Sequence, residues 1–194
     1  MLFVYLARHG ETSWNAEGKI QGHTDIPLNE AGRDQANALA DQLASKNLAA
    51  VGTSDLSRAR ETAAIVAKAL GLKPPVEEPL LRERQLGVFE GLTRAQLIER
   101  WPREWEAYKR DHANTPPEGE PYAAFLERIL TGARRLTRKL ARPDRPALIV
   151  AHGGVLKALI VATLDAPALV TVPNGALYRF SLEGERLLRA PSGA

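Results

Sequence analysis

The sequence predicts an α/β fold, a three-layer sandwich in which a central, mostly parallel sheet is flanked by helices. Three observations favour this class. Short apolar runs alternate with amphipathic helical patterns. The 194 residues suffice for one compact domain with a sizeable core. Finally, 44% of the residues are hydrophobic, which excludes a disordered chain. We expect a single domain over residues 1–194, because no linker divides the sequence.

Five stretches have the length and composition of strands. Leu2–Ala7 and Ala147–Ala151 are apolar throughout, as the buried strands of a parallel sheet usually are. A shorter run lies at Ala50–Thr53. Since helical patterns separate these three runs, we expect them to pair in parallel. The carboxyl-terminal part adds a strand at Ala176–Leu182 and a last one at Arg186–Ala190.

Helical periodicity fills the intervals between these runs. The first helix is expected at Ala31–Ser45 with Asn29 as its N-cap. A second is expected at Arg58–Leu70, with Ser57 as N-cap and a glycine after its end. Further helices are predicted at Thr93–Trp101, Pro102–Arg110, Tyr122–Ala141 and Val155–Thr163.

The segment around residues 90–121 differs from its surroundings. It is polar and helical, carries several aromatic side chains, and ends in a proline-containing loop at 111–121. It interrupts the alternation of strands and helices. We therefore interpret it as a helical cap insertion that covers the mouth of a site.

The composition excludes several classes of protein. The chain has no cysteine, which rules out a disulfide scaffold, thiol catalysis and zinc–thiolate sites. No apolar run is long enough to cross a bilayer, and the opening MLFVYLA lacks the basic leader and the length of a signal peptide. We expect a soluble, cytoplasmic protein that has no membrane partner.

The net charge is +3, from 26 basic and 23 acidic residues. The densest basic cluster lies in one helical segment and comprises Arg134, Arg135, Arg138, Lys139 and Arg142. These side chains mostly fall outside the apolar stripe of that helix, and no nucleic-acid-binding motif accompanies them. We interpret the cluster as a solvated helix face and expect no nucleic-acid partner.

Two histidines follow apolar strands in the same way. His9 follows Leu2–Ala7 and precedes a glycine, and His152 follows Ala147–Ala151 and precedes Gly153. Ligands of an open α/β sheet bind beyond the carboxyl ends of its strands, where helix N-termini favour anions. Two imidazoles with nearby arginines at such a place predict a phosphate site. The arginine-bearing turns that could reach it contain Arg8, Arg58, and Arg82 or Arg84.

The amino-acid sequences of five segments give a more specific indication of function than the positions of the histidines. The first reads LARHGETSWNAEGKIQGHTDIPLNEAGRDQA. The others, in order, are TSDLSRARETA at 53–63, LRERQLGVFEG at 81–91, VAHGG at 150–154 and VPNGA at 172–176. Together they resemble the histidine phosphatase superfamily, the phosphoglycerate mutase-like proteins. The wording QGHTDIPLNEAG is most similar to the broad-specificity phosphatase and α-ribazole phosphatase branch.

The resemblance implies roles for five residues. His9 matches the family's nucleophile, which forms a phosphohistidine while its other ring nitrogen donates to a backbone carbonyl. Arg8, Arg58 and His152 match the clamp that holds the phosphoryl oxygens. Glu83 matches the general acid that protonates the leaving alcohol and then takes a proton from water.

The resemblance also implies further contacts to phosphate or substrate, at Asn15, Gln21, Gly22 and Gly153. Three other carboxylates, Glu77, Glu78 and Glu90, do not occupy the matching position, and we expect them to be solvated. No metal is expected, because the histidines lack ligand spacing and the family chemistry needs none. No cofactor is expected either.

The same residues serve hydrolases and mutases within the superfamily. A mutase must exclude water from its phosphoenzyme, and the cofactor-dependent mutases have a longer segment between the glutamate and the second histidine. Here 68 residues separate Glu83 from His152. We therefore predict a phosphomonoesterase acting on small phosphorylated metabolites, with a 2,3-bisphosphoglycerate-dependent phosphoglycerate mutase as the alternative. A non-catalytic binding protein is disfavoured because no residue of the set is missing. A homodimer is compatible with the resemblance.

Overall fold

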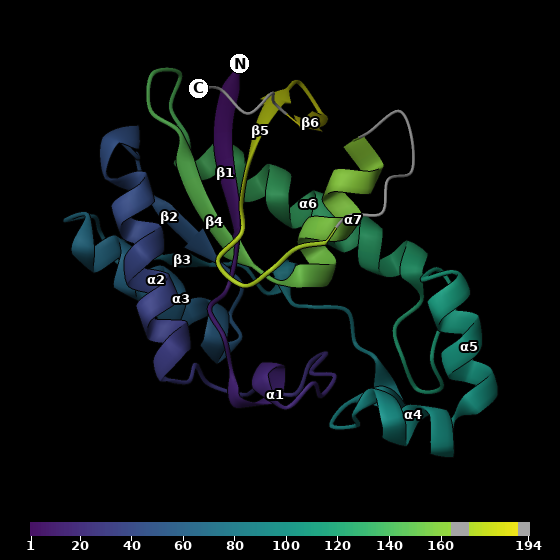
Figure 1. The fold of residues 1–194 in the computed structure, drawn as a ribbon. Coiled ribbons are helices and arrows are strands. Elements are labelled where there is room, and N and C mark those ends of the chain that lie inside the picture. The colour runs from purple at the N-terminus through teal and green to yellow at the C-terminus, as the bar shows by residue number, and fades with distance from the viewer. Residues whose placement is uncertain (164–170, 190–194) are drawn as a thin grey trace.

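The computed structural model describes residues 1–163 and 171–189. In that part of the chain, six strands form one sheet in the order β3-β2-β4-β1-β5-β6 (Figure 1). Strands β3, β2, β4 and β1 pair in parallel, whereas β5 and β6 are joined antiparallel at the β1 edge. This mixed sheet confirms the predicted fold class. The strands are β1 (Leu2–Arg8), β2 (Val51–Thr53), β3 (Val76–Glu77), β4 (Ala147–Ala151), β5 (Leu177–Glu183) and β6 (Arg186–Arg189).

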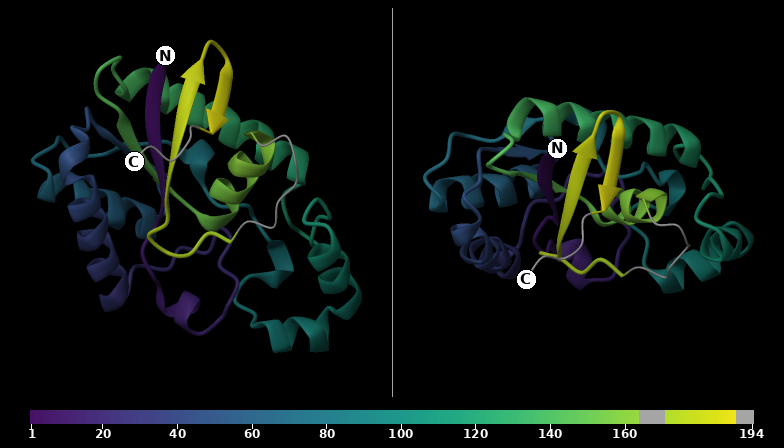
Figure 2. Two further views of the ribbon diagram at one scale, coloured as in Figure 1. Left: turned by 45° about the horizontal axis from the view of Figure 1, so that its top comes forward. Right: turned by 90° about the horizontal axis from the view of Figure 1, so that it is seen from above.

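Helices cover both faces of the sheet and complete the three layers (Figures 1 and 2). Helices α2 and α3 pack together on one face, and α6 and α7 pack on the other. The α-helices of the described part are α1 (Ser13–Ala16), α2 (Glu30–Leu43), α3 (Ser57–Ala69), α4 (Arg94–Arg100), α5 (Pro102–Arg110), α6 (Tyr122–Leu140) and α7 (Gly153–Thr163). Short 3-10 turns lie at Ala44–Lys46, Pro79–Leu81 and Gly87–Phe89.

Helix α6 shows how the apolar periodicity determines the packing. Phe125, Ile129, Ala133, Leu136 and Leu140 recur at three- and four-residue steps, and all five are buried against the sheet. Removing the phenylalanine, isoleucine and leucine side chains of this set from water stabilises the fold by about 1.5–3 kcal/mol each. Among the described residues, no helix combines the length and the apolar character that crossing a bilayer requires.

Two small elements were not predicted. β3 has only two residues, too few to show the alternation by which a strand is found in a sequence. α1 has four residues and is opened by a capping box between Thr12 and Asn15 rather than by an apolar stripe. At the other end of the chain, the predicted last strand is β6, and Ala190 lies outside the described residues.

The two predicted helix caps had different outcomes. Asn29 caps α2 as expected, because its side-chain oxygen accepts from the backbone N–H of Gly32. The prediction for Ser57 was wrong. Ser57 is the first residue of α3, and its N–H and hydroxyl both donate to the carboxylate of Asp25, at 2.8 and 2.7 Å. A carboxylate 32 positions earlier thus supplies the cap.

Helices α4 and α5 lie away from the sheet, on the side where β1 and β4 end (Figure 1). They enclose a small apolar cluster of their own, formed by Leu86, Phe89 and Leu97 with Trp101 and Trp105 against it. This arrangement places the region of residues 90–121 beside the carboxyl ends of the central strands. It is the place where a cap over a site would have to be.

Candidate active site

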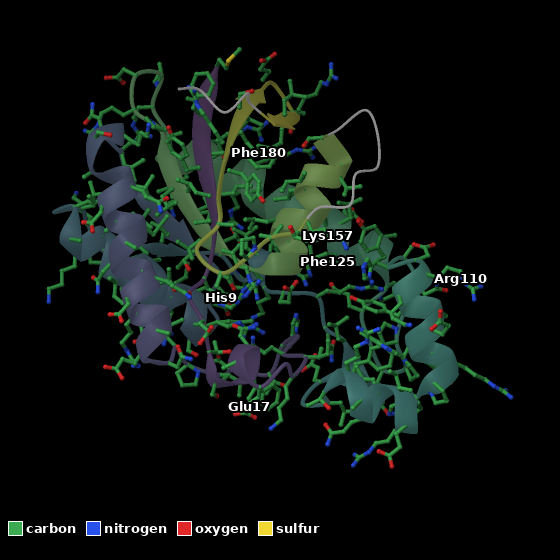
Figure 3. All side chains as sticks on the ribbon, in the orientation of Figure 1. His9, Glu17, Arg110, Phe125, Lys157 and Phe180 are labelled. Atoms are coloured by element: carbon green, nitrogen blue, oxygen red, sulfur yellow. The ribbon has the colours of Figure 1, made fainter. Side chains whose placement is uncertain are left out.

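The carboxyl ends of β1 and β4 bring the two histidines together. These strands are neighbours and parallel, with Arg8 opposite Ala151 in the register. His9 and His152 follow directly, both are buried, and their ring centroids lie 5.2 Å apart at an interplanar angle of 62°. Figure 3 shows His9 below the sheet, where the segments from several elements converge. The predicted pairing of the two histidine corners is confirmed.

The orientation of the His9 ring is fixed by its neighbour. Nδ1 lies 2.7 Å from the carbonyl oxygen of Gly10, which can only accept a hydrogen bond. Nδ1 therefore carries the proton, and in the neutral ring the lone pair is on Nε2. Gly10 is needed here, because a Cβ at this position would overlap the backbone of Gly32. This is the hydrogen bond that the sequence resemblance implied.

Burial keeps both imidazoles neutral. The pKa of His9 lies well below 6.5, first because its charged form would be desolvated and then because Arg58 and Arg8 repel a second positive charge. The pKa of His152 is lowered well below 6.5 by burial and then by Arg58 and His9. A neutral imidazole is the form in which Nε2 of His9 is a nucleophile.

These shifts predict an unusual titration. Because the neutral form persists as the pH falls, His9 and His152 should remain neutral at pH 6, where histidines with an ordinary pKa of about 6.5 are mostly charged. Nitrogen-detected NMR of the imidazoles in the free protein measures this directly. The denatured protein provides the control, since its histidines should titrate near the ordinary value. Half-protonation of His9 at about pH 6.5 in the folded protein would contradict the assignment.

His152 is held by a residue that the sequence analysis did not single out. Its Nε2 lies 2.9 Å from the hydroxyl oxygen of Ser54, which is completely buried at the end of β2. The other ring nitrogen, Nδ1, is buried and has no hydrogen-bond partner among the described residues. The position of Ser54 directly after a buried strand was the available signal, as it was for the two histidines.

Two arginines lie near His9, and among the described residues no carboxylate is hydrogen-bonded to either. Arg8 donates from Nη1 to the carbonyl of Val172 at 2.7 Å. Arg58, which is 1% exposed, donates to the carbonyls of Thr24 and Gly22 at 2.9 and 2.8 Å. In both, Nε is buried without a partner among the described residues, and desolvation lowers the pKa. Carbonyl oxygens orient these guanidinium groups and leave their charges for an anion.

Glu83 lies at the rim of this site and is held by the backbone. Its carboxylate accepts from the N–H of Gly154 at 2.8 Å and from the N–H of Arg84 at 2.9 Å. A Cβ on Gly154 would overlap the carboxylate, and a Cβ on Gly153 would approach Nε of Arg8 to 3.3 Å. The two glycines at the start of α7 thus let two side chains of the site come close to the backbone.

The other expected contacts are engaged with one another. The side-chain oxygen of Asn15 accepts from Thr12 and, at 3.3 Å, from Asn174. The side-chain oxygen of Gln21 accepts from the Thr12 hydroxyl at 3.1 Å, and Gln21 is buried. Thr12 thus connects Gln21 to Asn15, and Asn174 connects Asn15 to the backbone carbonyl of His9.

Two carboxylates expected in solvent are hydrogen-bonded within the protein, and one of them, Glu78, is buried. Glu90 accepts from the backbone N–H groups of His23, Thr24 and Leu86, so it organises the loop that orients Arg58. Glu78 is 5% exposed, caps a 3-10 turn, and lies 3.5 Å from Arg135. The prediction failed because carboxylates can be buried when backbone N–H groups satisfy them. Glu77 is exposed as expected.

Of the two alternative arginines, neither joins the clamp. Arg82 forms a bidentate pair with Asp55, with Nε 2.8 and 3.1 Å from the two carboxylate oxygens. Arg84 donates instead to the carbonyls of the loop before α6, among them that of Glu120 at 2.9 Å. Next to Arg84 and Glu83 a cavity of about 510 Å³ opens, lined by residues of α5, α6 and α7.

Comparison with known proteins agrees with this geometry. The model of the histidine phosphatase superfamily (branch 1) matches residues 4–188. A probable phosphoglycerate mutase of Yersinia enterocolitica is 40% identical over 172 residues, 86% of this chain and 77% of the relative. A metal-independent phosphoserine phosphatase of Arabidopsis thaliana is 33% identical over 186 residues, 94% and 77% of the two chains. The α-ribazole phosphatase of Shigella flexneri has a similar structure, with a TM-score of 0.81 at 29% identity over 97% of this chain and 94% of that one.

Proposed function

This chain belongs to the histidine phosphatase superfamily, and on that premise we propose that it is a phosphomonoesterase: it hydrolyses small phosphorylated metabolites through a phosphohistidine on His9, with Glu83 as general acid and base. One observation carries the proposal. Three buried nitrogen atoms, Nε of Arg8, Nε of Arg58 and Nδ1 of His152, have no partner among the described residues. These three residues lie next to His9, whose Nε2 is free of its proton. A phosphoryl group is the ligand that would satisfy them.

The first half of the reaction transfers the phosphoryl group to the protein. Nε2 of His9 attacks phosphorus as the bond to the ester oxygen breaks, and Glu83 gives its proton to the leaving alcohol. Arg8, Arg58 and Nδ1 of His152 hold the equatorial oxygens, where negative charge is spread in the transition state. The products of this half are the alcohol, phosphohistidine and the Glu83 carboxylate.

The second half uses the same groups in reverse. A water molecule takes the place of the alcohol. As the water oxygen attacks phosphorus, the Glu83 carboxylate accepts a proton from that water. The phosphorus–nitrogen bond breaks, and its electrons return to Nε2 of His9. Phosphate leaves, Glu83 is protonated again, and the protein is ready for the next ester. The N–H of Gly154 holds the carboxylate in place for both transfers.

The mutase remains the second candidate function, because relatives with that name match as well as the phosphatases do. The two functions differ in what attacks the phosphohistidine: water in a phosphatase, and a phosphoglycerate hydroxyl in a mutase. The shorter segment between Glu83 and His152 favours access of water.

A substrate panel tests the choice. We expect metal-independent phosphate release at pH 5.5–7.5 from nitrophenyl phosphate, phosphoserine, α-ribazole phosphate and sugar phosphates, unaffected by a chelator. The parallel assay supplies 3-phosphoglycerate with 2,3-bisphosphoglycerate and follows isomerisation. Isomerisation much faster than hydrolysis would replace the phosphatase with the mutase. We also propose a cytoplasmic location and a homodimer.

A further inference from the structure

The cavity beside Glu83 is where the alcohol part of an ester would lie. Glu83 and Gly154 both line it, so an ester whose leaving oxygen receives the Glu83 proton places its leaving group in this space. Its volume of about 510 Å³ is typical of a site for a small organic molecule. A three-carbon acid would leave most of it unfilled. The size of the cavity therefore indicates a leaving group larger than a three-carbon acid.

Most of the cavity wall is apolar and partly aromatic. Tyr108 of α5 and Tyr122 and Phe125 of α6 contribute rings, and Leu86 and Val161 contribute aliphatic side chains. A flat apolar group would bury its surface against these rings. A fully hydroxylated chain, such as that of a sugar, would lose hydrogen bonds to water here without replacing them.

The tyrosine rings are held in place by Arg84. Its guanidinium group lies 5.9 Å from the ring centroid of Tyr108 and 5.4 Å from that of Tyr122. The same group donates to oxygens of His112, Asn114, Thr115 and Glu120. The hydrogen bonds and ring contacts of Arg84 thus hold its guanidinium group in the wall of the cavity. Its charge supports the rings rather than being directed at a ligand.

Lys157 is the half-buried cation of the cavity that remains for a ligand, whereas Arg110 is exposed. On α7, Gly154, Lys157, Ala158 and Val161 follow at three- and four-residue steps and all line the cavity, so this stripe of the helix faces it. Lys157 lies about 6 Å along the helix from Gly153, at 1.5 Å per residue. Among the described residues, no carboxylate lies within ion-pair distance of its ammonium group, and none accepts a hydrogen bond from it. Figure 3 shows Lys157 close to Phe125, with Arg110 farther out on α5.

The charge around Lys157 is positive on balance. Of the cavity's charged residues, Arg84, Arg110 and Lys157 are cationic, and Glu83 and Asp111 are anionic. Burial lowers the pKa of Lys157, and the pKa of His112 is lowered by burial and then by the charges of Lys157 and Arg84. A half-buried ammonium group without a counter-ion gains most from a ligand that brings one.

We propose that the leaving group of the natural ester combines an aromatic or similarly flat apolar ring with an anionic substituent, and that the ring lies between Tyr108 and Phe125 while the anion binds Lys157. The inference rests on the proposed function, because it assigns the part of the substrate that the phosphate site does not hold. Lys157 is then a specificity-determining residue. It makes no contact with the phosphoryl group.

Three non-hydrolysable phosphonates test this by calorimetry without depending on turnover. Methylphosphonate carries the anion alone, benzylphosphonate adds a ring, and carboxymethyl-benzylphosphonate adds an acid at the far end. We expect the ring to tighten binding about tenfold, from apolar burial after the cost of ordering. The carboxylate should tighten it about tenfold again, through a charge-assisted hydrogen bond.

Lys157→Met keeps most of the side-chain volume and removes the charge. It should abolish the gain in binding affinity that the carboxylate gives and leave the gain in affinity from the ring unchanged. Lys139→Met, at an exposed position of α6 outside the cavity, is the matched control and should retain both gains. A carboxylate gain that is absent in the wild type, or that survives in Lys157→Met, overturns the assignment of Lys157. An absent ring gain overturns the aromatic assignment.

Failure of the proposed function has a different signature. If none of the three phosphonates bound and no phosphate ester was hydrolysed, the anion site itself would be wrong and both proposals would fall. If simple esters were hydrolysed but the carboxylate made no difference, the phosphomonoesterase would stand and only the substrate class would be lost.

Discussion

Replacing His9 by alanine should reduce turnover about 10⁴-fold or more, because the covalent route is lost and water must attack the ester directly. The same change should abolish the trapped phosphoenzyme. Denaturing an aliquot during turnover at a pH where phosphohistidine is stable, followed by peptide mass spectrometry, locates the phosphoryl group. We expect it on the peptide that contains His9. His9→Ala should show none there or elsewhere.

The second buried histidine supplies the matched control. His152→Asn removes a ring that is as deeply buried as that of His9, so a general loss of structure would affect both variants. In this variant turnover should also fall, but a phosphoryl group should still accumulate on His9. Circular dichroism of both variants checks that they are folded. Full turnover in His9→Ala, or a phosphoryl group on His152 in the wild type, would contradict the assignment of the nucleophile.

Glu83→Gln should have an effect that depends on the leaving group. For alkyl phosphates the phosphorylation step should slow by about 10²–10⁴-fold, because an alkoxide leaves poorly without a proton. Nitrophenolate leaves as a stable anion, so phosphorylation by nitrophenyl phosphate should slow far less. The water step still lacks its base. We therefore expect rapid-mixing experiments to show a burst of about one nitrophenol per site, followed by slow turnover.

Glu78→Gln is the control for this change. Glu78 is buried, as a carboxylate of the site would be, but it caps a 3-10 turn and lies near Arg135 instead of Gly154. Its variant should keep the leaving-group dependence of the wild type even if it is less stable. Equal losses for alkyl and nitrophenyl esters in Glu83→Gln would remove the general-acid role and leave Glu83 as a structural support of α7.

Much of the site could be predicted from the sequence because it follows the periodic elements. His9 and His152 come directly after fully apolar strands, and parallel strands end at the same edge of a sheet. Asn29 could be predicted as a cap from its local position alone. The approach of Glu83 to Gly154 could not, because the Gly154 N–H donates to the side chain of a residue 71 positions earlier.

The failures have a common physical cause. Local position favours Ser57 as the cap of α3, but Asp25 reaches this helix from another loop. Glu90 looks like a surface residue in the sequence, yet backbone N–H groups of a distant loop surround it. Ser54 contacts His152 across 98 positions. Each of these depends on tertiary contacts that have no periodic signature in the chain.

The stereochemical course at phosphorus tests the central claim most directly. A phosphate ester made chiral with oxygen isotopes is hydrolysed in isotopically labelled water, and the configuration of the released phosphate is determined by NMR. Two successive in-line displacements, first by His9 and then by water, predict overall retention of configuration. Inversion would mean that water attacks the ester in a single step, and it would contradict a phosphohistidine intermediate.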